Sequence, residues 1–444
     1  MSGDPPTPLH VAILSFGYPP IRHVCGTRAS EMGAALVALG FGVTVVTVDW
    51  RPSGEDRPPD VVERGVRVVR IDPREWLASF DPTRPPYTTE PESRVAVFRR
   101  LRTLHHMLGW GAYATWARRA LAELVAVHAR RAVDVVWAIH GDDSCHEVAA
   151  RFSRTTGVPW VADFKDPWNG GRLGPLMWCL RWTKTSRRLK TSAALTETCS
   201  GQGELDAQFG RPWHEIWSGY DDAAMASVAT VRVSDRFTIG YFGTVNERHD
   251  VPLAARSLGA WTAGLSDPSE AEFHVFGYCG DVWREALDRT GAGALLHVHE
   301  MIPREQAFSR MKGVDALLLL PLANMGRWGA LIGVKELEYL ASGTPVLCLG
   351  RMAPEFRSRF GGLSQLVEAA DETAAAAFLR DEHSRFRAGM SSARRSEVNT
   401  PIVAGHAWSA QAQYLADVLK GVVAHRQNRS RVVQPLGVAA GRAS

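Results

Sequence analysis

The sequence predicts an α/β protein built from two doubly wound domains. Short hydrophobic runs recur along the chain, and most are followed by a segment with helical periodicity, which is the alternation typical of parallel sheets. This alternation begins near the N-terminus and starts again at 237–245. A chain of 444 residues is also longer than one hydrophobic core ordinarily supports. We therefore expect two parallel sheets, each with helices packed against it.

The first half of the chain predicts one such domain. Its buried strands are expected at 9–15, 43–49, 66–71, 133–139, 159–164 and 193–198. Its helices are expected at 28–39, 92–131, 146–156 and 176–192. Prolines crowd the segment 73–93, which we interpret as a loop.

The second half repeats the pattern. Strands are expected at 237–245, 271–277, 295–302, 314–322 and 346–349. Helices follow most of them, alanine-rich helices continue through Leu379, and a last helix is expected at 403–425. Polar, irregular residues separate the two halves. We therefore predict domains at 1–225 and 226–425, followed by a flexible tail at 426–444.

Composition argues against several classes of function. The net charge of +4 is small for this length, which disfavours a dedicated nucleic-acid-binding protein. No run approaches the ~18 apolar residues of a membrane-spanning helix. The first apolar segment lacks a preceding basic region, so no signal peptide is expected. The six cysteines are scattered, with no CxxC pair. We expect a cytoplasmic protein with reduced cysteines.

No metal site is expected either. His297 and His299 alternate along a predicted strand. Two histidines alone do not make a zinc site, and the sequence offers no evident third ligand. We interpret both side chains as structural.

The most informative stretch is GVKELEYLASGTPVLCLG at 333–350. It reads as a short helix that ends at Gly343 and leads into a buried strand, which is one unit of a parallel sheet. Lys335 and Glu338 lie near the sheet edge at which open α/β folds bind ligands. Lys335 can face a phosphate and Glu338 can accept hydrogen bonds from ribose hydroxyls. The alternative for both is an ordinary solvated charge.

A second phosphate signal is GYFGTVNERHD at 240–250. A strand is followed by a turn that contains Gly243 and Thr244, where backbone N–H groups suit a phosphate. Arg248 is the candidate cation. The stretch is not GxGxxG, so the sequence has no fingerprint for NAD or FAD.

The first half offers a candidate substrate loop at 16–30. Gly26 allows close approach of the backbone, and Arg28 is expected at a helix start. A cation at that end of a helix opposes the helix dipole. Arg28 therefore favours either an anionic ligand or a nearby acidic side chain.

Charged residues also follow two predicted strands of the first half. Asp163, Lys165 and Asp166 come at the end of one strand, and His140 follows another. Charges at strand ends are costly to bury without partners, which favours a cleft. His140 is a candidate acid or base. For each residue alone, a hydrogen-bonded polar group in a loop is an equally good interpretation.

Two basic helices that contain tryptophan are expected at 99–119 and 178–190. Such helices can contact anionic lipid or an acidic acceptor, and a solvated cationic helix face is the more common explanation. Peripheral contact with the inner face of a membrane is therefore a secondary hypothesis.

Taken together, these segments resemble the GT-B glycosyltransferases of family 4 (group 1), over nearly the whole chain. The matching pieces include SFGYPP, GVPWVADFKDPW, WSGYDD, IGYFGTV and KELEYLASGTPVL. The second and last of these are specific together, and they are similar to the members that carry a DFRDPW signature.

The resemblance implies two Rossmann-like domains facing an interdomain cleft, with a C-terminal helix that returns toward the first domain. It implies transfer of a sugar from a nucleotide-sugar donor to an acceptor hydroxyl, with retention and without a metal or cofactor. Glu338 would bind the donor ribose, Arg248 and Lys335 would face the diphosphate, and Gly26 would approach the sugar.

The sequence also departs from these relatives. Ala330 stands where many of them have a second glutamate, and Lys165 stands where those outside the DFRDPW group have a catalytic histidine. The acceptor is left open as a polysaccharide intermediate, a lipid carrier or a secondary metabolite. The alternatives in function are a nucleotide-sugar epimerase, a sugar phosphorylase, or a degenerate scaffold that binds a partner.

Overall fold

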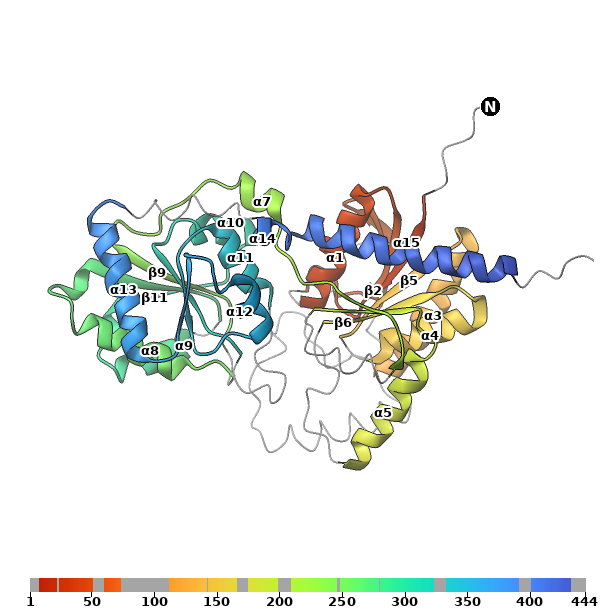
Figure 1. Ribbon diagram of the computed structural model, residues 1–444, viewed down its shortest axis with the longest axis horizontal. Helices are drawn as coiled ribbons and strands as arrows, with labels where there is room; N and C mark the ends of the chain where they lie inside the picture. Colours follow the sequence, from red (N-terminus) through yellow and green to blue (C-terminus); the bar gives the residue numbers. More distant parts are fainter. Residues whose placement is uncertain are drawn as a thin grey trace, which may run out of the picture. The chain divides into compact units, whose positions relative to one another are not determined.

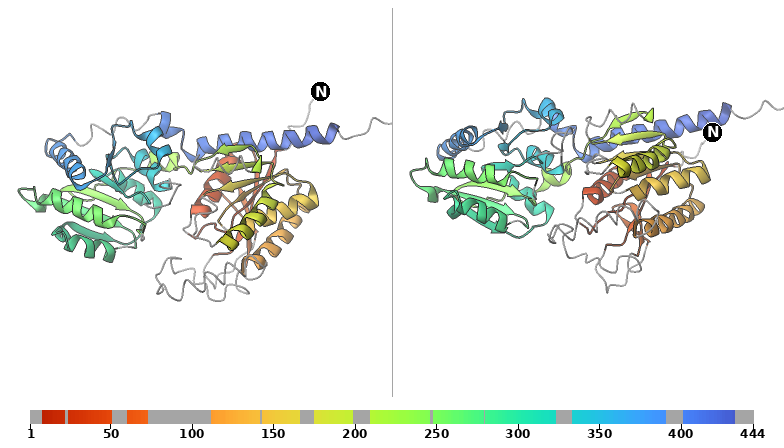
Figure 2. Two further views of the ribbon diagram at one scale, coloured as in Figure 1. Left: turned by 60° about the horizontal axis from the view of Figure 1, so that its bottom comes forward. Right: turned by 90° about the horizontal axis from the view of Figure 1, so that it is seen from below.

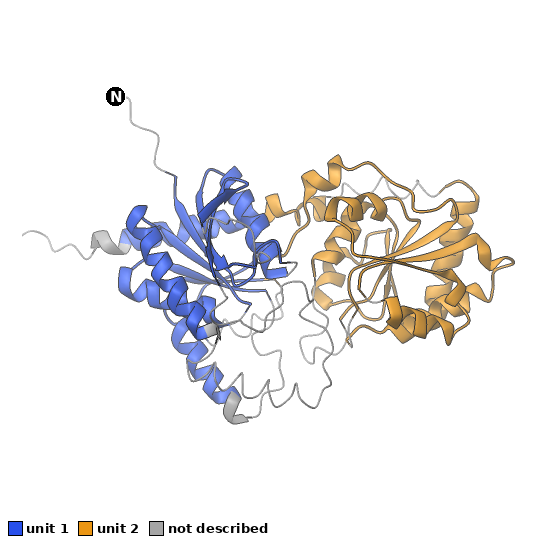
Figure 3. Cartoon of the chain, turned by 180° about the vertical axis from the view of Figure 1, so that it is seen from behind, with its two compact units in different colours: residues 1–197, 203–216, 412–444 blue, residues 198–202, 217–411 orange. Residues whose placement is uncertain are grey.

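A computed structural model describes most of the chain. The described residues are 8–21, 24–50, 60–72, 112–141, 143–165, 175–198, 209–245, 248–278, 280–322, 333–390 and 401–432. The chain divides into two compact units (Figure 3). Unit 1 comprises residues 1–197, 203–216 and 412–444, and unit 2 comprises residues 198–202 and 217–411. The main division falls at 216/217, earlier than the expected 225/226.

Unit 1 contains a sheet with the strand order β3-β4-β2-β1-β5-β6-β7-β8 among the described residues. The bounds are β1 His10–Leu14, β2 Gly42–Val48, β3 Asp60–Glu63, β4 Val66–Ile71, β5 Val135–Ile139, β6 Trp160–Phe164, β7 Ala194–Glu197 and β8 Trp213–Glu215. The strand pairs are parallel, except that β3 is antiparallel to β4. The central strands are buried along their whole length, as expected when helices cover both faces.

The helices of unit 1 follow its strands (Figure 1). They are α1 Val24–Ala38, α3 Ala112–Arg130, α4 Asp143–Thr156 and α5 Pro175–Leu189. Residues of α3, α4 and the sheet share one hydrophobic core, which includes Trp116, Phe152 and Trp160. The last helix, α15 Trp408–Val432, belongs to unit 1 from Ala412 onward, so the predicted return of the C-terminal helix is confirmed.

Unit 2 contains a second parallel sheet with the strand order β11-β10-β9-β12-β13-β14. The bounds are β9 Phe237–Phe242, β10 Ala271–Phe276, β11 Leu296–His299, β12 Ala316–Leu319, β13 Val346–Leu349 and β14 Leu366–Ala369. The order reverses direction at β9, which is the pattern of a doubly wound fold. The carboxyl end of β9 therefore lies at the position where such sheets bind ligands.

Helices cover both faces of this second sheet (Figure 2). One core contains residues of α8 Val251–Thr262, α9 Gly280–Asp288 and α13 Glu372–Arg387. The other contains residues of α7 Asp222–Ser227, α10 Arg304–Met311, α11 Val334–Ser342, α12 Pro354–Phe360 and α14 Pro401–Ala404. Alternate residues of β9 enter the two cores, Tyr241 in the first and Phe242 in the second, because successive side chains of a strand point to opposite faces.

Three elements differ from the sequence predictions. α1 begins at Val24, so Arg28 lies inside the helix and not at its start. β14 replaces an expected helical stretch, because hydrogen bonding to β13 outweighs local propensity. α15 continues to Val432, into the segment expected to be a tail. The predicted loop 73–93 and most of the basic helix 99–119 lie outside the described residues.

Candidate functional site

The carboxyl end of β9 meets that of β10 through two glycines. Gly243 directly follows β9 and has a φ of 128°, a backbone conformation that residues other than glycine rarely adopt. A Cβ atom on Gly277, which follows β10, would lie 2.2 Å from the carbonyl oxygen of Gly243. The turn at Gly243 and Thr244 is therefore held against the next strand, and only glycine fits at position 277.

Lys335 lies beside this turn. It occupies the first turn of α11, and its Nζ donates a hydrogen bond to the Tyr241 hydroxyl at 3.1 Å. A Cβ atom on Gly243 would lie 3.7 Å from the Lys335 side chain. Lys335 and Gly243, which the sequence nominates separately, thus lie together at the edge of the sheet where doubly wound folds bind ligands. A cation, a glycine turn and a helix N-terminus are the parts from which phosphate sites are made.

Glu338 lies one helical turn beyond Lys335 and has a partner that the sequence did not indicate. Arg304, at the start of α10, donates a hydrogen bond from Nε to Oε1 of Glu338 at 3.0 Å, and its Nη2 forms an ion pair with the same oxygen at 2.9 Å. The Glu338 side chain is only 13% exposed. The pair leaves the guanidinium of Arg304 beside the carboxylate assigned to the ribose, so Arg304 joins the candidate site.

Two further residues of α11 anchor the site. Tyr339 is buried; its hydroxyl accepts a hydrogen bond from the N–H of Phe242 at 2.7 Å and lies 3.3 Å from the carbonyl oxygen of that residue. Glu336 accepts a hydrogen bond from the N–H of Gly333 at 2.9 Å, and burial raises the pKa of this carboxyl. Tyr339 fixes α11 against the end of β9, and Glu336 caps the start of α11.

Arg248 and Thr244 are exposed at the same end of unit 2. Arg248 stands just before α8, whose first turn is capped by the Asp250 side chain, which accepts from the N–H of Leu253 at 2.9 Å. The role of Arg248 toward a diphosphate stays a prediction. Ala330 lies outside the described residues.

In unit 1, Arg28 and Asp163 pair with each other. The Arg28 guanidinium donates from Nε at 2.9 Å and from Nη2 at 2.7 Å to the two oxygens of the carboxylate, and both side chains are fully buried. Thr196 donates to Asp163 at 2.7 Å. Of the two alternatives for Arg28, an anionic ligand or an acidic neighbour, the structure supplies the acidic neighbour.

His140 also has a protein partner. Its Nε2 lies 3.2 Å from the carboxylate of Asp143, at the start of α4. Burial raises the pKa of Asp143, but the hydrogen bond from His140 and the charges of Arg181 and Arg188 outweigh it, so the pKa falls below its usual range. Lys165 follows β6 and is partly buried, and Asp166 lies outside the described residues. His140 and Asp163 are neighbours at this edge, because the backbone N–H of His140 donates to the backbone carbonyl of Asp163 at 2.8 Å.

Gly26 is a close-packing position inside α1. A Cβ atom there would lie 3.1 Å from the backbone of Tyr18, so the segment before α1 lies directly on the helix. The neighbouring Cys25 is buried, and its thiol lies 3.7 Å from the carbonyl oxygen of His140. Gly26 and His140 therefore belong to the same end of the unit 1 sheet.

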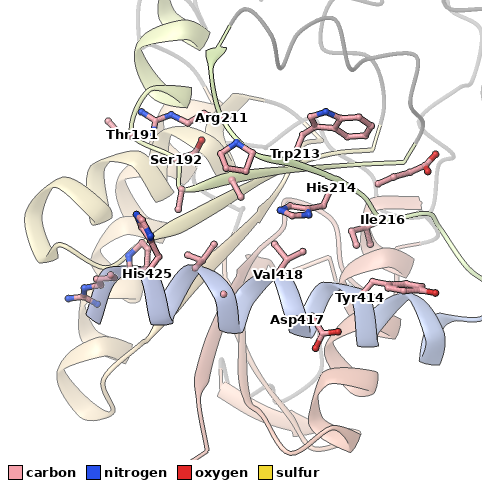
Figure 4. A pocket seen from close by; sticks show the side chains of 18 of the residues that line it. Thr191, Ser192, Arg211, Trp213, His214, Ile216, Tyr414, Asp417, Val418 and His425 are labelled. Carbon is pink, nitrogen blue, oxygen red and sulfur yellow. The ribbon is translucent and has the colours of Figure 1, made fainter. Parts of the chain in front are cut away.

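Unit 1 also contains a large cavity (Figure 4). It has a volume of about 1340 Å³ and lies between α15 and the edge of the sheet. Its lining includes Pro159, Ala193 and Ala194, at the starts of β6 and β7, together with Trp213, His214, Tyr414 and His425. None of the predicted site residues lines this cavity.

Comparison with known proteins identifies the fold. No family model and no curated protein matches the chain. Sucrose-phosphate synthase from Thermosynechococcus elongatus matches with a TM-score of 0.62 and 13% identity, over 94% of this chain and 100% of that one. HepE of Anabaena, in complex with UDP and glucose, matches with a TM-score of 0.59 and 12% identity, over 93% and 100%. The catalytic domain of starch synthase IV from Arabidopsis thaliana, bound to ADP and acarbose, matches with a TM-score of 0.63 and 10% identity, over 94% of this chain and 100% of that one.

These likenesses, together with the two parallel sheets, establish the class of the fold. The chain has the GT-B fold of these glycosyltransferases, with two Rossmann-like units, as the sequence predicts. At identities of 10 to 13%, the comparison defines the architecture, and the function must be argued from the residues.

Proposed function

We propose that this protein is a glycosyltransferase that uses a nucleotide-sugar donor and that unit 2 binds the donor. The observation that carries the proposal is the meeting of Lys335, Glu338 and the Gly243 turn at the switch point of the second sheet. This combination offers a cation for a diphosphate and a carboxylate for vicinal hydroxyls. The neighbouring solved structures that contain UDP and ADP support the same class of ligand.

The structure adds one residue to the proposed donor site. Arg304 contacts Glu338 and is 31% exposed. It orients the carboxylate through one hydrogen bond and an ion pair, both to Oε1, so the carboxylate presents its remaining lone pairs to a ribose in a fixed direction. Glu338 is then a positioned acceptor, and Arg304 is its positioning residue.

For the chemical step, we propose displacement on the front face of the donor sugar, which retains the anomeric configuration. The acceptor oxygen bonds to the anomeric carbon as the bond from that carbon to the diphosphate breaks, and the hydroxyl proton passes to the departing diphosphate. Lys335, Arg248 and backbone N–H groups of the Gly243 turn would stabilise the leaving charge. The acceptor would bind at unit 1, near His140 and Lys165. Assignment to family 4 and its DFRDPW group remains part of this proposal.

Binding tests the donor site directly. The full chain is screened by thermal shift with UDP, GDP, ADP and their glucose and mannose conjugates, and we expect at least one to raise the melting temperature. Lys335→Ala should lower the affinity for that ligand by about 10-fold or more, since hydrogen bonds to charged groups contribute about 1.5–3 kcal/mol. Arg289→Ala is the matched control, because it removes a cation just after α9 that is 72% exposed. If no nucleotide binds at millimolar concentration, the proposal is overturned.

Product analysis then separates glycosyl transfer from the alternatives. A transferase forms a new glycoside and free nucleoside diphosphate in equal amounts. An epimerase returns an isomeric nucleotide sugar, and a phosphorylase consumes inorganic phosphate. Tight nucleotide binding without any of these products, over a screen of acceptors, would indicate a scaffold that has lost catalysis.

Contact with a membrane is a weaker proposal. Among the described residues, no helix is both long and apolar enough to cross a bilayer. Trp178 and Leu180 of α5 are 40% and 44% exposed, which favours a surface contact. Against it, Arg188 pairs with Glu147 at 2.5 Å, and Arg181 lies 3.6 Å from Asp143, so part of the basic face serves the fold. Sedimentation with anionic vesicles tests this contact.

A further inference from the structure

A cluster of histidines lies on one face of the unit 2 sheet, at its edge. His274 of β10 pairs in register with His297 of β11, and Phe276 pairs with His299. Glu272 precedes His274 by two positions, so its side chain lies on the same face. From the sequence, only His297 and His299 could be recognised as neighbours on one face of a strand. The parallel pairing of β10 with β11 brings Glu272 and His274 to them.

Three of these side chains converge at distances suited to a metal. The Nε2 atom of His274 lies 2.9 Å from Oε2 of Glu272, and Nε2 of His297 lies 3.8 Å from Oε1 of the same carboxylate. The ligand atoms of all three residues lie within 4.8 Å of one another. Metal–ligand bonds of about 2.0–2.2 Å in a tetrahedral arrangement place ligand atoms roughly 3.3 Å apart, so small rotamer shifts suffice.

A neighbouring histidine supports the central ligand. Nδ1 of His274 lies 2.8 Å from Nε2 of His299, so the ring nitrogen that does not face the carboxylate also has a partner. The rings of His297 and His274 are stacked at 4.7 Å, and those of His299 and Phe276 at 4.3 Å. Metal-bound histidines ordinarily have their second ring nitrogen held in this way, which fixes the ring orientation.

The burial of the three residues fits a site that is open on one side. Glu272 and His274 are 9% and 5% exposed, whereas the His297 side chain is 44% exposed. The cation in contact with the carboxylate is Arg236, whose Nη1 lies 3.2 Å from Oε1 of Glu272 and whose side chain is 54% exposed. A carboxylate that binds a metal through Oε2 can keep Arg236 on its other oxygen.

We propose that Glu272, His274 and His297 form a site for a divalent transition metal, with Zn²⁺ as the preferred ion. Two imidazoles and one carboxylate are a donor set that zinc accepts, with water in the remaining position. The site joins the edge strand β11 to β10 and lies on the sheet face that also carries Phe242, whose ring stacks on Phe276 at 4.7 Å. Its role is to hold the edge of the sheet, independently of the proposed glycosyl transfer.

Metal titration of the tag-free full chain tests the site. After dialysis against chelator, the protein is titrated with ZnCl₂ by calorimetry, and we expect one equivalent to bind and the melting temperature to rise. His297→Ala changes an exposed side chain and should weaken binding by about 10-fold or more. His425→Ala removes an exposed histidine from α15 in unit 1 and should leave binding unchanged.

Cobalt substitution shows which side chains bind. Co²⁺ in a site of two nitrogen ligands and one oxygen ligand should give visible bands of a four- or five-coordinate ion and no thiolate charge-transfer band. These bands should be absent from His274→Gln, with retained far-UV circular dichroism as the check on folding. A thiolate band, the absence of stoichiometric zinc binding, or wild-type affinity in His297→Ala would each overturn the proposal.

Discussion

Arg28 and Asp163 form a buried ion pair with two hydrogen bonds in unit 1, although they lie 135 positions apart in the chain. Arg28 also donates to the carbonyl oxygen of Ile216 at 2.9 Å, and its guanidinium lies over the ring of Trp137 at 5.3 Å. The pair therefore ties α1 to β6 and to the segment after β8. It places two residues nominated for ligand contact in the structural interior of the unit.

Removing one member of this pair should destabilise unit 1 severely. Asp163→Asn leaves the Arg28 charge buried without its counter-ion, and we expect a loss of about 3–5 kcal/mol. The double variant Arg28→Met/Asp163→Leu should recover most of this loss, because no charge then remains buried. Hydrogen-exchange mass spectrometry reports the two units separately and measures both effects. An Asp163→Asn protein with unchanged exchange in β6 would contradict this account.

A methyl group at position 277 should disturb unit 2. In Gly277→Ala the added carbon would meet the Gly243 carbonyl oxygen at 2.2 Å, so the ends of β9 and β10 must separate. Overpacking of this kind costs about 1–3 kcal/mol, and it should also weaken nucleotide binding if the Gly243 turn holds the diphosphate. Urea unfolding and nucleotide titration measure the two effects. Gly362→Ala is the control, since a Cβ atom there meets nothing within 4 Å.

His146 should make the stability of unit 1 depend on pH. Burial, followed by the nearby charge of His140, lowers the pKa of His146 from 6.5 to about 3. The unfolded chain therefore takes up a proton on this group below pH 6.5, whereas the folded chain does so only near pH 3. Its contribution to stability is complete above pH 6.5 and is lost as the pH falls toward 3, by roughly 2 kcal/mol at pH 5.

The variant His146→Gln isolates this effect, because glutamine can still donate to the carbonyl of Ala138, which His146 Nε2 contacts at 3.1 Å. The stability difference between wild type and variant should be larger at pH 7.5 than at pH 5. Unfolding in urea at both values gives this difference. Equal differences at the two values would show that His146 is not held neutral.

Glu336 should stabilise unit 2 through its hydrogen bond and not through its charge. Glu336→Gln keeps an acceptor for the N–H of Gly333, and, since burial disfavours the charged carboxylate, the variant should be as stable as wild type or more stable at pH 8. Glu336→Ala loses the cap and should cost about 1 kcal/mol. Wild-type stability should fall as the pH rises through the raised pKa of Glu336, and that part of the pH profile should vanish in Glu336→Gln. A less stable Glu336→Gln would instead indicate that the charge is needed.

The parts of the proposed donor site were largely recognisable in the sequence because its elements are local. Lys335, Glu338 and Gly343 belong to one helix and its cap, and Gly343 has the expected left-handed conformation, with a φ of 76°. The turn at Gly243 follows a strand whose hydrophobic run is plain in the sequence. Arg304 and Tyr339 were missed, because a charged or aromatic residue in a helix does not indicate which distant group it will contact.

By itself, the sequence determined two parallel α/β units, because the alternation of buried strands and helices is written in residue patterns of short range. Tertiary structure alone decided the partners of the charges. Arg28 meets Asp163, because helix α1 begins four residues earlier than the sequence indicates and carries the guanidinium into the buried interior. The register of β10 and β11 likewise gathers Glu272, His274 and His297, and that register is set by packing across the whole sheet and not by the residues that it brings together.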